Sequence, residues 1–287
     1  MTAVIIPAYN EAASIEETLQ AVLNSAGDEA AEVIVVCNGC TDDTARRSRR
    51  FGPRVQVIET PVGSKPHALN LGDEAAKSFP RIYLDADVLV SKTLIGDLAR
   101  ALDDPRPLVA YPNVNHDLER SSAAVRAFYD VWRSMPYNLP GRIGVGVYAL
   151  NRGGRERFGR FPDLISDDGF VRGQFSVDEC RIIESCSTTV RAPATLGSLV
   201  KIKTRARLGV YQLRRLHPEA LRRHHSSGDL GDGRRRATAG TRLRNWPVYL
   251  VVNAVTRLRA AFQMRSLERY RWERDESTRT HLAMEHR

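Results

Sequence analysis

The sequence predicts an α/β fold in which a mostly parallel β-sheet is flanked by helices, followed by a basic, mainly helical C-terminal segment. Two observations lead to this prediction. Short apolar runs alternate with segments of helical periodicity over roughly the first 110 residues, as in sheets built from strand–helix–strand units. From about residue 204 the composition shifts towards arginine, and a long segment of helical spacing follows.

The strands are predicted from short runs rich in Val, Ile and Leu, which suit strands buried on both faces. These runs are residues 2–6, 32–37, 55–58, 81–85 and 108–111. The first four are each followed by a segment with helical character. These segments predict helices from Glu11, with Asn10 as N-cap, and over residues 42–50, 67–77 and 91–102. Later in the chain, the pattern predicts helices at 121–136 and 248–267 and a strand at 142–150.

Composition limits the class of protein. The chain has 287 residues, of which 42% are hydrophobic, enough for a large buried core. The longest apolar stretch of the C-terminal region, residues 247–252, is far shorter than the roughly 20 residues that span a bilayer. No basic region precedes the first apolar run, so we expect no signal peptide and a cytoplasmic protein.

The four cysteines fit a reduced, intracellular chain. Cys37 and Cys40 form a C-x-x-C pattern, which can indicate zinc binding or redox chemistry. There is no second such pair and no histidine close to the first. We therefore interpret the two as one strand cysteine and one turn cysteine.

Charge is distributed unevenly along the chain. Residues 201–287 contain 21 Lys and Arg against 8 Asp and Glu, a net charge of +13, whereas residues 1–200 have a net charge of −4. A basic segment of this kind is typical of contact with an anionic partner. Arg222, Arg223 and residues 234–236 could contact an anionic membrane surface, at about 1 kcal/mol per charge close to it, or form a solvated face.

Polar residues follow three of the predicted strands at the points where these strands end. Tyr9 and Glu11 follow the first strand, Asn38 follows the second, and Asp85 and Asp87 close the fourth. The carboxyl ends of parallel strands meet at one edge of a sheet, where ligands bind. These side chains are therefore expected to form one site. No G-x-G-x-x-G follows the first strand, which argues against a dinucleotide-dependent oxidoreductase.

Asp85 and Asp87 are candidate metal ligands. They are two positions apart at a predicted strand end, so both carboxylates are expected on the same side. Two carboxylates suit Mg²⁺ or Mn²⁺, with phosphate oxygens and water as the remaining ligands. Ala86 between them is small and would leave room for a sugar or ribose. Seen in isolation, such a pair is more often a set of solvated turn residues.

Several segments, taken in order, make this sequence resemble the family 2 inverting glycosyltransferases, which have the GT-A fold. They are IPAYNE at 6–11, VVCNGCTDDT at 35–44, GSKPHALNLG at 63–72, LDAD at 84–87 and SDD at 166–168. The resemblance covers about residues 1–175. It implies transfer of a sugar from a nucleoside diphosphate-sugar to an acceptor hydroxyl with inversion, assisted by a divalent metal.

The resemblance also implies roles in nucleotide binding. Pro7, Ala8 and Tyr9 would line the base, and the ring of Tyr9 could stack on it. Glu11 would accept hydrogen bonds from the ribose or base, unless it only interacts with a helix dipole. Asn38 stands where many relatives carry Asp, so the choice between uridine and guanosine stays open.

Charged residues elsewhere have implied catalytic roles. Lys65 would neutralise the diphosphate, unless it is simply an exposed loop lysine. Asp167 and Asp168 occupy the place of the family's later acidic pair, and an inverting transfer needs one carboxylate as general base. Successive residues at a helix start point about 100° apart, so only one can serve. The family pattern favours Asp168, although both could be helix-capping acids.

We therefore expect a GT-A domain over residues 1–203, with a nucleotide-binding part at about 1–110, an acceptor part at about 111–203, and a basic segment at 204–287. A role in cell-surface glycan, glycolipid or secondary glycoside synthesis rests on family analogy alone. Three alternatives remain. A sugar nucleotidyltransferase would carry a Gly-rich basic loop after the first strand, which is missing. Nucleic-acid binding through the basic segment leaves the acidic residues unexplained. An inactive sugar-nucleotide-binding scaffold needs an activity assay to exclude it.

Overall fold

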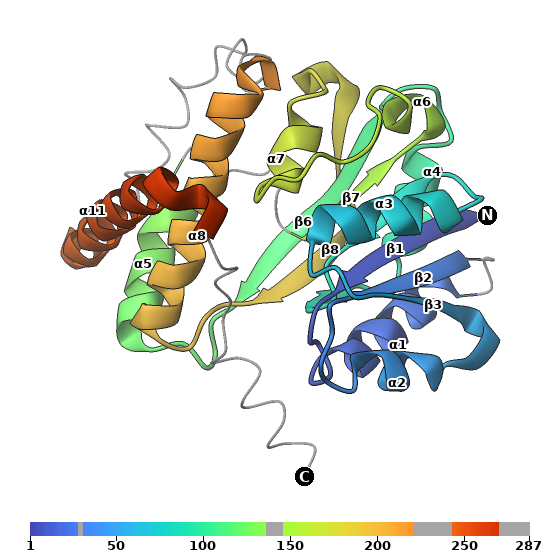
Figure 1. Cartoon of the computed structure of the whole chain (residues 1–287), viewed down its shortest axis with the longest axis horizontal. Coiled ribbons are helices and arrows are strands. Elements are labelled where there is room, and N and C mark those ends of the chain that lie inside the picture. Colours follow the sequence, from blue (N-terminus) through green and yellow to red (C-terminus); the bar gives the residue numbers. More distant parts are fainter. Residues whose placement is uncertain (28–30, 136–145, 221–242, 270–287) are drawn as a thin grey trace. The chain divides into compact units, whose positions relative to one another are not determined.

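The computed structural model describes residues 1–27, 31–135, 146–220 and 243–269 of the chain (Figure 1). The chain divides into two compact units. The first comprises residues 1–115, 143–163 and 174–190, and the second comprises residues 116–142, 164–173 and 191–287.

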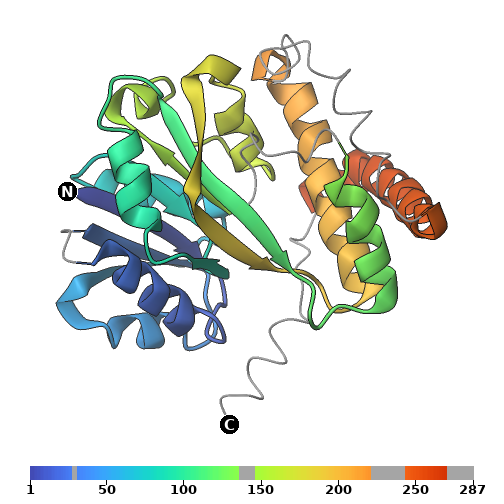
Figure 2. The same ribbon diagram turned by 180° about the vertical axis from the view of Figure 1, so that it is seen from behind.

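The first unit is built on a mixed β-sheet (Figures 1 and 2). Its eight strands have the order β3-β2-β1-β4-β7-β6-β8-β5. In chain order the strands are β1 (Thr2–Ala8), β2 (Ala31–Asn38), β3 (Val55–Thr60), β4 (Arg81–Leu84), β5 (Val88–Val90), β6 (Val109–Asp117), β7 (Val147–Leu150) and β8 (Cys180–Arg191). Strands β1 to β4 pair in parallel, whereas β7 is antiparallel to β4 and β6, and β5 is antiparallel to β8. The predicted fold class is confirmed.

Helices cover both faces of the parallel strands. The helices of this unit are α1 (Ile15–Ala26), α2 (Thr44–Arg49), α3 (Lys65–Ala75), α4 (Leu94–Ala101) and α6 (Arg152–Arg155), with short 3₁₀ turns η1 (Gly52–Arg54) and η3 (Val177–Glu179). Val4 and Ile6 of β1 pack in one core cluster with residues of α1 and α4. Ile5 faces the other way, where α3 approaches so closely that a Cβ on Gly72 would lie 2.5 Å from Ile5 Cγ2. Burial on both faces explains why β1 is a continuous apolar run.

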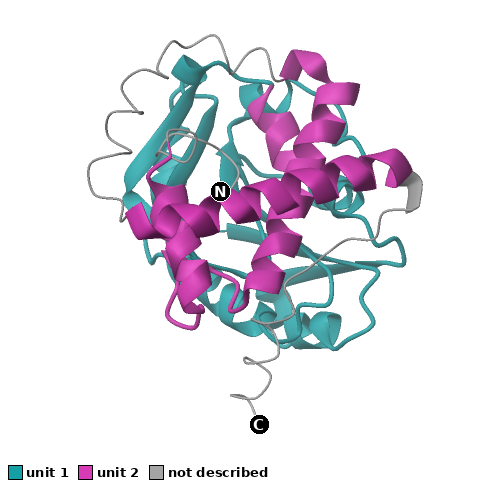
Figure 3. Cartoon of the chain, turned by 90° about the vertical axis from the view of Figure 1, so that its left-hand side faces the viewer, with its two compact units in different colours: residues 1–115, 143–163, 174–190 teal, residues 116–142, 164–173, 191–287 magenta. Residues whose placement is uncertain are grey.

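The second unit is helical (Figure 3). Its elements are α5 (Ala123–Arg133), α7 (Asp167–Arg172), α8 (Leu196–Leu216), η4 (Leu243–Asn245), α11 (Trp246–Gln263) and η5 (Met264–Arg269). Phe128 of α5, Leu199 of α8 and Tyr249 of α11 share one buried cluster, in which the rings of Phe128 and Tyr249 stack with centroids 5.5 Å apart. These helices confirm the predicted helical character of the C-terminal region. Within the described part of the chain, no helix combines the length and apolar character needed to cross a bilayer.

Some predicted boundaries are wrong. Helix α1 begins at Ile15 with Ser14 at its N-cap, not at Glu11, and Asn10 adopts a left-handed φ of 53° instead of capping a helix. The predicted strand at 81–85 ends at Leu84. The strand predicted at 108–111 extends to Asp117 and is antiparallel to its neighbour β7.

Strands β5 and β8 were not predicted. Strand β5 is only three residues long, and β8 carries polar and half-exposed side chains that give no apolar run. The domain boundary near residue 203 stays a prediction. The arginines predicted to contact a membrane, at 222, 223 and 234–236, lie outside the described residues.

A buried carboxylate, Asp73 of α3, joins this helix to β4 and α6. It accepts a hydrogen bond from the Tyr83 hydroxyl at 2.7 Å and pairs with Arg81 and Arg155, each at 2.5 Å. Burial and the nearby carboxylate raise the pKa of Tyr83 well above its usual range, so its hydroxyl remains a donor. The positive charges of two guanidinium groups are therefore balanced by the one carboxylate of Asp73.

Replacement of Asp73 by Asn is expected to lower the free energy of unfolding by about 3–5 kcal/mol, because it leaves buried charges uncompensated. Urea denaturation measures this loss. Glu74→Gln is the matched control in the same helix, since Glu74 is exposed and pairs with exposed Arg160 at the surface. Loss of such a surface pair costs less than about 1 kcal/mol. Similar losses for the two variants would contradict the role given to Asp73.

Candidate functional site

The carboxyl ends of β1, β2 and β4 form one rim of the sheet. Strand β1 lies between β2 and β4 and is parallel to both, with Ala8 opposite Cys37 and Ile5 opposite Tyr83. Tyr9, Asn38 and Asp85 stand at or just beyond these strand ends. The expectation that these residues gather at one edge is therefore confirmed, because parallel pairing brings equivalent strand ends together.

Asp85, Ala86 and Asp87 form a tight turn between β4 and β5. The Asp85 carbonyl accepts a hydrogen bond from Val88 N–H at 3.3 Å, and the Ala86 carbonyl accepts one from the Thr18 hydroxyl of α1 at 2.9 Å. Because Asp85 and Asp87 lie in a turn and not in a strand, the alternation of side chains along a strand does not show that their carboxylates lie on the same side. Ala86 is buried in the core cluster, so packing accounts for its small size. Its predicted contact with a sugar stays a prediction.

Lys65 lies beside the turn. It is the first residue of α3, and its Nζ is 2.8 Å from Asp85 Oδ1. Ser64 caps this helix, with its hydroxyl oxygen accepting from His67 N–H at 3.3 Å. The structure thus brings the cation predicted for the diphosphate into contact with a predicted metal ligand.

The two carboxylates at this turn are oxygen donors of the kind that Mg²⁺ and Mn²⁺ bind. Among the described residues, no group of three or more His, Cys, Asp or Glu side chains could hold a metal ion by itself. A hard cation bound by one or two carboxylates completes its coordination with phosphate oxygens and water. Gly146, with φ at +80°, keeps the turn compact, because a Cβ there would lie 2.7 Å from Val88 Cγ2 and 3.4 Å from Asp85 Oδ2. The absence of a side chain at Gly146 therefore lets its backbone pack closely against the turn, next to Asp85.

Asn38 is buried at the end of β2 and is tied to β1. Its Nδ2 donates to the Ala8 carbonyl at 2.9 Å. Because a carbonyl can only accept, this bond fixes which way the amide is turned. Tyr9 lies on the same rim, with its ring against the loop that follows β3, 3.7 Å from the position of a Cβ on Gly63.

The loops after β1 and β2 are clasped together by hydrogen bonds that sequence reasoning missed. Asn10 Oδ1 accepts from Thr41 N–H at 2.7 Å, and Thr44 Oγ1 accepts from Glu11 N–H at 2.8 Å. Asp42 Oδ2 accepts from Ala12 N–H at 3.0 Å. Each bond joins residues about thirty positions apart, so only the paired strands bring them together.

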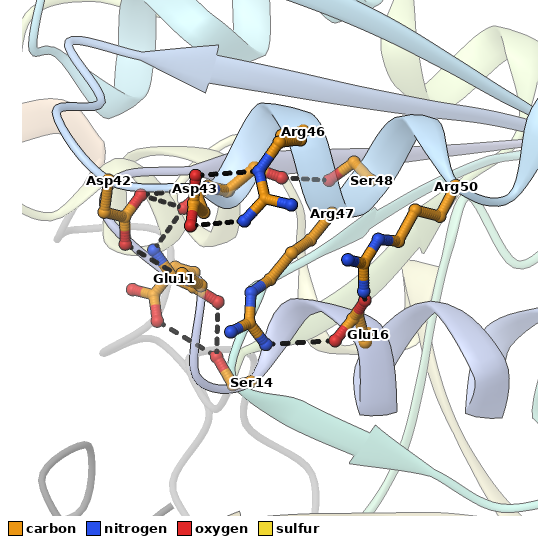
Figure 4. Close-up of polar contacts among 11 residues, drawn as sticks. Glu11, Ser14, Glu16, Asp42, Asp43, Arg46, Arg47, Ser48 and Arg50 are labelled. Atoms are coloured by element: carbon orange, nitrogen blue, oxygen red, sulfur yellow. Dashed lines mark hydrogen bonds and ion pairs between the residues drawn. The ribbon is translucent and has the colours of Figure 1, made fainter. Parts of the chain in front are cut away.

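Glu11 is buried within this clasp (Figure 4). Its Oε2 accepts from the Ser14 hydroxyl at 3.1 Å, and its carbonyl accepts from Ile15 N–H at 2.9 Å. Behind the clasp, Glu16 of α1 pairs with Arg47 at 3.0 Å and with Arg50 at 2.9 Å, both from the α2 region (Figure 4). The loop that carries Tyr9 and Glu11 is therefore joined to its neighbour by several hydrogen bonds.

Cys37 and Cys40 are free thiols at the same strand end. Cys37 lies in β2 and Cys40 in the loop beyond it, which confirms their interpretation as strand and turn cysteines. Cys40 Sγ accepts from Asn10 N–H and donates to the Ala8 carbonyl, each at 3.3 Å. Its hydrogen bond with Cys37 lowers the pKa of Cys40 to about 7, and the same bond raises the pKa of Cys37.

Asp167 and Asp168 belong to the second unit, at the start of α7. Asp167 is buried, whereas Asp168 is half-exposed and its Oδ1 accepts from Gly169 N–H at 2.7 Å and from the Ser166 hydroxyl at 3.0 Å. Helix α7 is seated closely on α8, since a Cβ on Gly209 would lie 3.0 Å from Ser166 Cβ. The two carboxylates thus differ in exposure, as expected for neighbours at a helix start.

Comparison with known proteins points to one family. Residues 3–156, more than half of the chain, match the family model described as Glycosyl transferase family 2. A search of curated proteins gives no match. Mannosyltransferase PcManGT from Pyrobaculum calidifontis, solved with GDP-Man and Mn²⁺, aligns over 98% of this chain and 84% of that one, at 22% identity and a TM-score of 0.57.

Glucosyl-3-phosphoglycerate synthase from Mycobacterium tuberculosis, solved with Mn²⁺, UDP-Glc and phosphoglyceric acid, aligns over 75% of this chain and 79% of that one, at 19% identity and a TM-score of 0.55. At these identities the likeness to both structures shows a shared fold of the GT-A type.

Proposed function

The chain belongs to glycosyl transferase family 2, and we propose that it transfers a hexose from a nucleoside diphosphate-sugar to an acceptor hydroxyl with the aid of a divalent metal. The observation that carries this proposal is the contact between Lys65 and Asp85 at the rim where β1, β2 and β4 end. A cation and a carboxylate stand side by side at the edge of a parallel sheet, where ligands bind. Together they suit a diphosphate and the cation that accompanies it.

The base binds at the ends of β1 and β2, lined by Pro7, Ala8 and Tyr9. Asn38 accepts a hydrogen bond from the base through Oδ1, because one N–H of its amide already binds the Ala8 carbonyl and this bond sets the orientation of the amide. In this respect Asn38 acts as an Asp would. Uracil and guanine both carry a ring N–H, so this hydrogen bond does not distinguish a uridine donor from a guanosine donor. Glu11 accepts a hydrogen bond from the ribose.

The diphosphate binds beside Lys65, Asp85 and Asp87. Lys65 places its ammonium group against the turn and neutralises part of the phosphate charge. Asp85 and Asp87 hold Mg²⁺ or Mn²⁺, which when bound stabilises negative charge on the departing diphosphate. The structures that carry Mn²⁺ with GDP-Man or UDP-Glc, which share this fold, support that choice of metal and of donor class.

Asp168 is the general base. The acceptor oxygen attacks the anomeric carbon as the bond to the diphosphate breaks, and Asp168 takes the hydroxyl proton. Half-exposure of Asp168 supports this role, as do the two hydrogen bonds that orient its Oδ1. Burial of Asp167 makes it the less suitable of the pair. The acceptor is a lipid-linked intermediate, a glycan or a small metabolite, and the pathway rests on family analogy alone.

A thermal-shift panel tests the donor. UDP- and GDP-linked hexoses are each mixed with the protein with and without Mn²⁺, and free hexoses and nucleoside monophosphates serve as controls. One nucleoside diphosphate-sugar is expected to raise the unfolding midpoint only with Mn²⁺. At a hundred times its dissociation constant, a ligand adds about 2.7 kcal/mol to the stability of the folded state. A panel in which no diphosphate-sugar shifts the midpoint would overturn the proposal.

A further inference from the structure

One face of α11 exposes a strip of large apolar side chains. Half of the twelve exposed large hydrophobic residues in the described part of the chain lie between 243 and 262. Leu258 is 73% exposed and Phe262 is 71% exposed. These six residues are Leu243, in the turn η4 just before α11, and Leu250, Val251, Val255, Leu258 and Phe262 of α11. An apolar concentration of this kind on one helix commonly marks an interaction site.

The strip is not needed for packing of the helix. Tyr249, Val252, Thr256 and Ala260 form the buried side of α11, which packs on α5 and α8 of the same unit (Figure 1). Val252 on this side is buried, whereas Val255, three positions later, is exposed. The helix is thus apolar on two sides, and within the described part of the chain only one of these packs against other elements. Helices that are apolar all round are normally buried completely.

Positive charge borders the strip. At 100° per residue, Arg257 stands at one edge of the exposed arc, next to Leu250, and Arg259 stands at the other edge, next to Val255. Residues 243–267 contain four arginines and no Asp or Glu, and residues 221–242, which precede them, contain six arginines and two aspartates. Long basic side chains at the edges of an apolar strip suit a surface that is apolar inside and anionic outside.

We propose that the exposed face of α11 docks on an anionic lipid bilayer. The helix lies in the plane of the interface, with Leu258 and Phe262 inserted among the acyl chains and Arg257 at the level of the headgroups. A second copy of the chain fits the face less well, because a two-fold contact would bring the same arginines together. The proposal concerns where the enzyme works and does not depend on the donor or on the base.

Vesicle co-sedimentation of the full-length protein tests the proposal. The protein is mixed with vesicles of phosphatidylcholine alone or of phosphatidylcholine with phosphatidylserine. We expect binding to the anionic vesicles, weakened about tenfold or more in the double variant Leu258→Gln, Phe262→Gln, which loses the inserted side chains. Arg257→Gln should weaken binding about fivefold, since one charge near the surface contributes about 1 kcal/mol.

Val177→Gln is the matched control, because it replaces another exposed apolar side chain, in the first unit, and should bind like the wild type. Each variant should keep the wild-type unfolding midpoint, since the changed side chains are exposed. Wild-type binding by the Leu258→Gln, Phe262→Gln variant would overturn the proposal. Vesicle binding would then be explained by electrostatic attraction between the basic residues of the chain and the anionic lipids. Absence of vesicle binding together with a dimer that this variant dissolves would also overturn the proposal, because it would identify a second copy as the partner. The donor-induced thermal shift is expected to be the same in all of these variants.

Discussion

Replacement of Asp168 by Asn is expected to lower the rate of sugar transfer by about 10²–10⁴-fold, the usual contribution of a positioned general base. An amide cannot take the proton from the attacking acceptor hydroxyl. Asn keeps the size of the side chain and can still accept hydrogen bonds from Gly169 N–H and the Ser166 hydroxyl through its carbonyl oxygen. Donor binding should therefore be unchanged. Initial-rate assays with the donor from the thermal-shift panel measure the first quantity, and titration of that donor measures the second.

Two further variants make the test specific to this carboxylate. Asp178→Asn changes an exposed aspartate ten residues later in the chain, which pairs with exposed Arg106, and should transfer sugar at the wild-type rate. Asp167→Asn changes the buried neighbour and should act mainly on stability. If Asp167→Asn stops transfer with donor binding intact while Asp168→Asn does not, the roles of the two residues are reversed. Loss of donor binding in Asp168→Asn would place this residue in the donor site instead.

Replacement of Asp87 by Ala is expected to abolish the Mn²⁺-dependent part of donor binding. A cation held by two carboxylates loses half of its protein ligands, and the diphosphate loses the charge that offsets its own. The thermal shift of the variant with donor and Mn²⁺ should fall to the shift that the wild type shows with donor and a chelator. At saturating donor this removes a stabilisation of about 2.7 kcal/mol.

Asp104→Ala provides the control, because it removes an exposed aspartate from a loop elsewhere in the same unit. Its shift with donor and Mn²⁺ should equal that of the wild type. Asp85→Ala is less specific, since it also removes the partner of Lys65. Undiminished Mn²⁺-dependent binding by Asp87→Ala would mean that the metal is held elsewhere.

The parts of the site that the sequence predicted are those that follow from local pattern. Apolar runs at β1, β2 and β4 predict buried parallel strands, and that prediction alone places Tyr9, Asn38 and Asp85 on one rim. The polar residues at the strand ends can be identified from the sequence without knowing which distant parts of the chain are in contact. The roles of Asp168 and Asp87 remain predictions, because the fold positions these side chains without showing what they bind.

Contacts between distant residues could not be predicted in this way. Asn is a common N-cap residue, yet the Asn10 side chain accepts a hydrogen bond from Thr41 N–H, and the helix begins at Ile15 with Ser14 at its N-cap. The contact of Lys65 with Asp85 depends on where α3 begins relative to β4, twenty residues apart. Such pairs are set by the packing of whole elements rather than by spacing along the chain.

The distinction between local sequence patterns and contacts of distant residues applies to the whole protein. The sequence by itself determined the α/β class, the rim of the sheet and the family resemblance, because strand and helix periodicities and strand-end residues are local properties. Only the tertiary structure decided which face of α11 is buried. Apolar residues occur around most of that helix, and its burial against α5 and α8 leaves Leu258 and Phe262 in solvent. Periodicity can identify an apolar face, but which face packs inward depends on the shape of the partners that cover it.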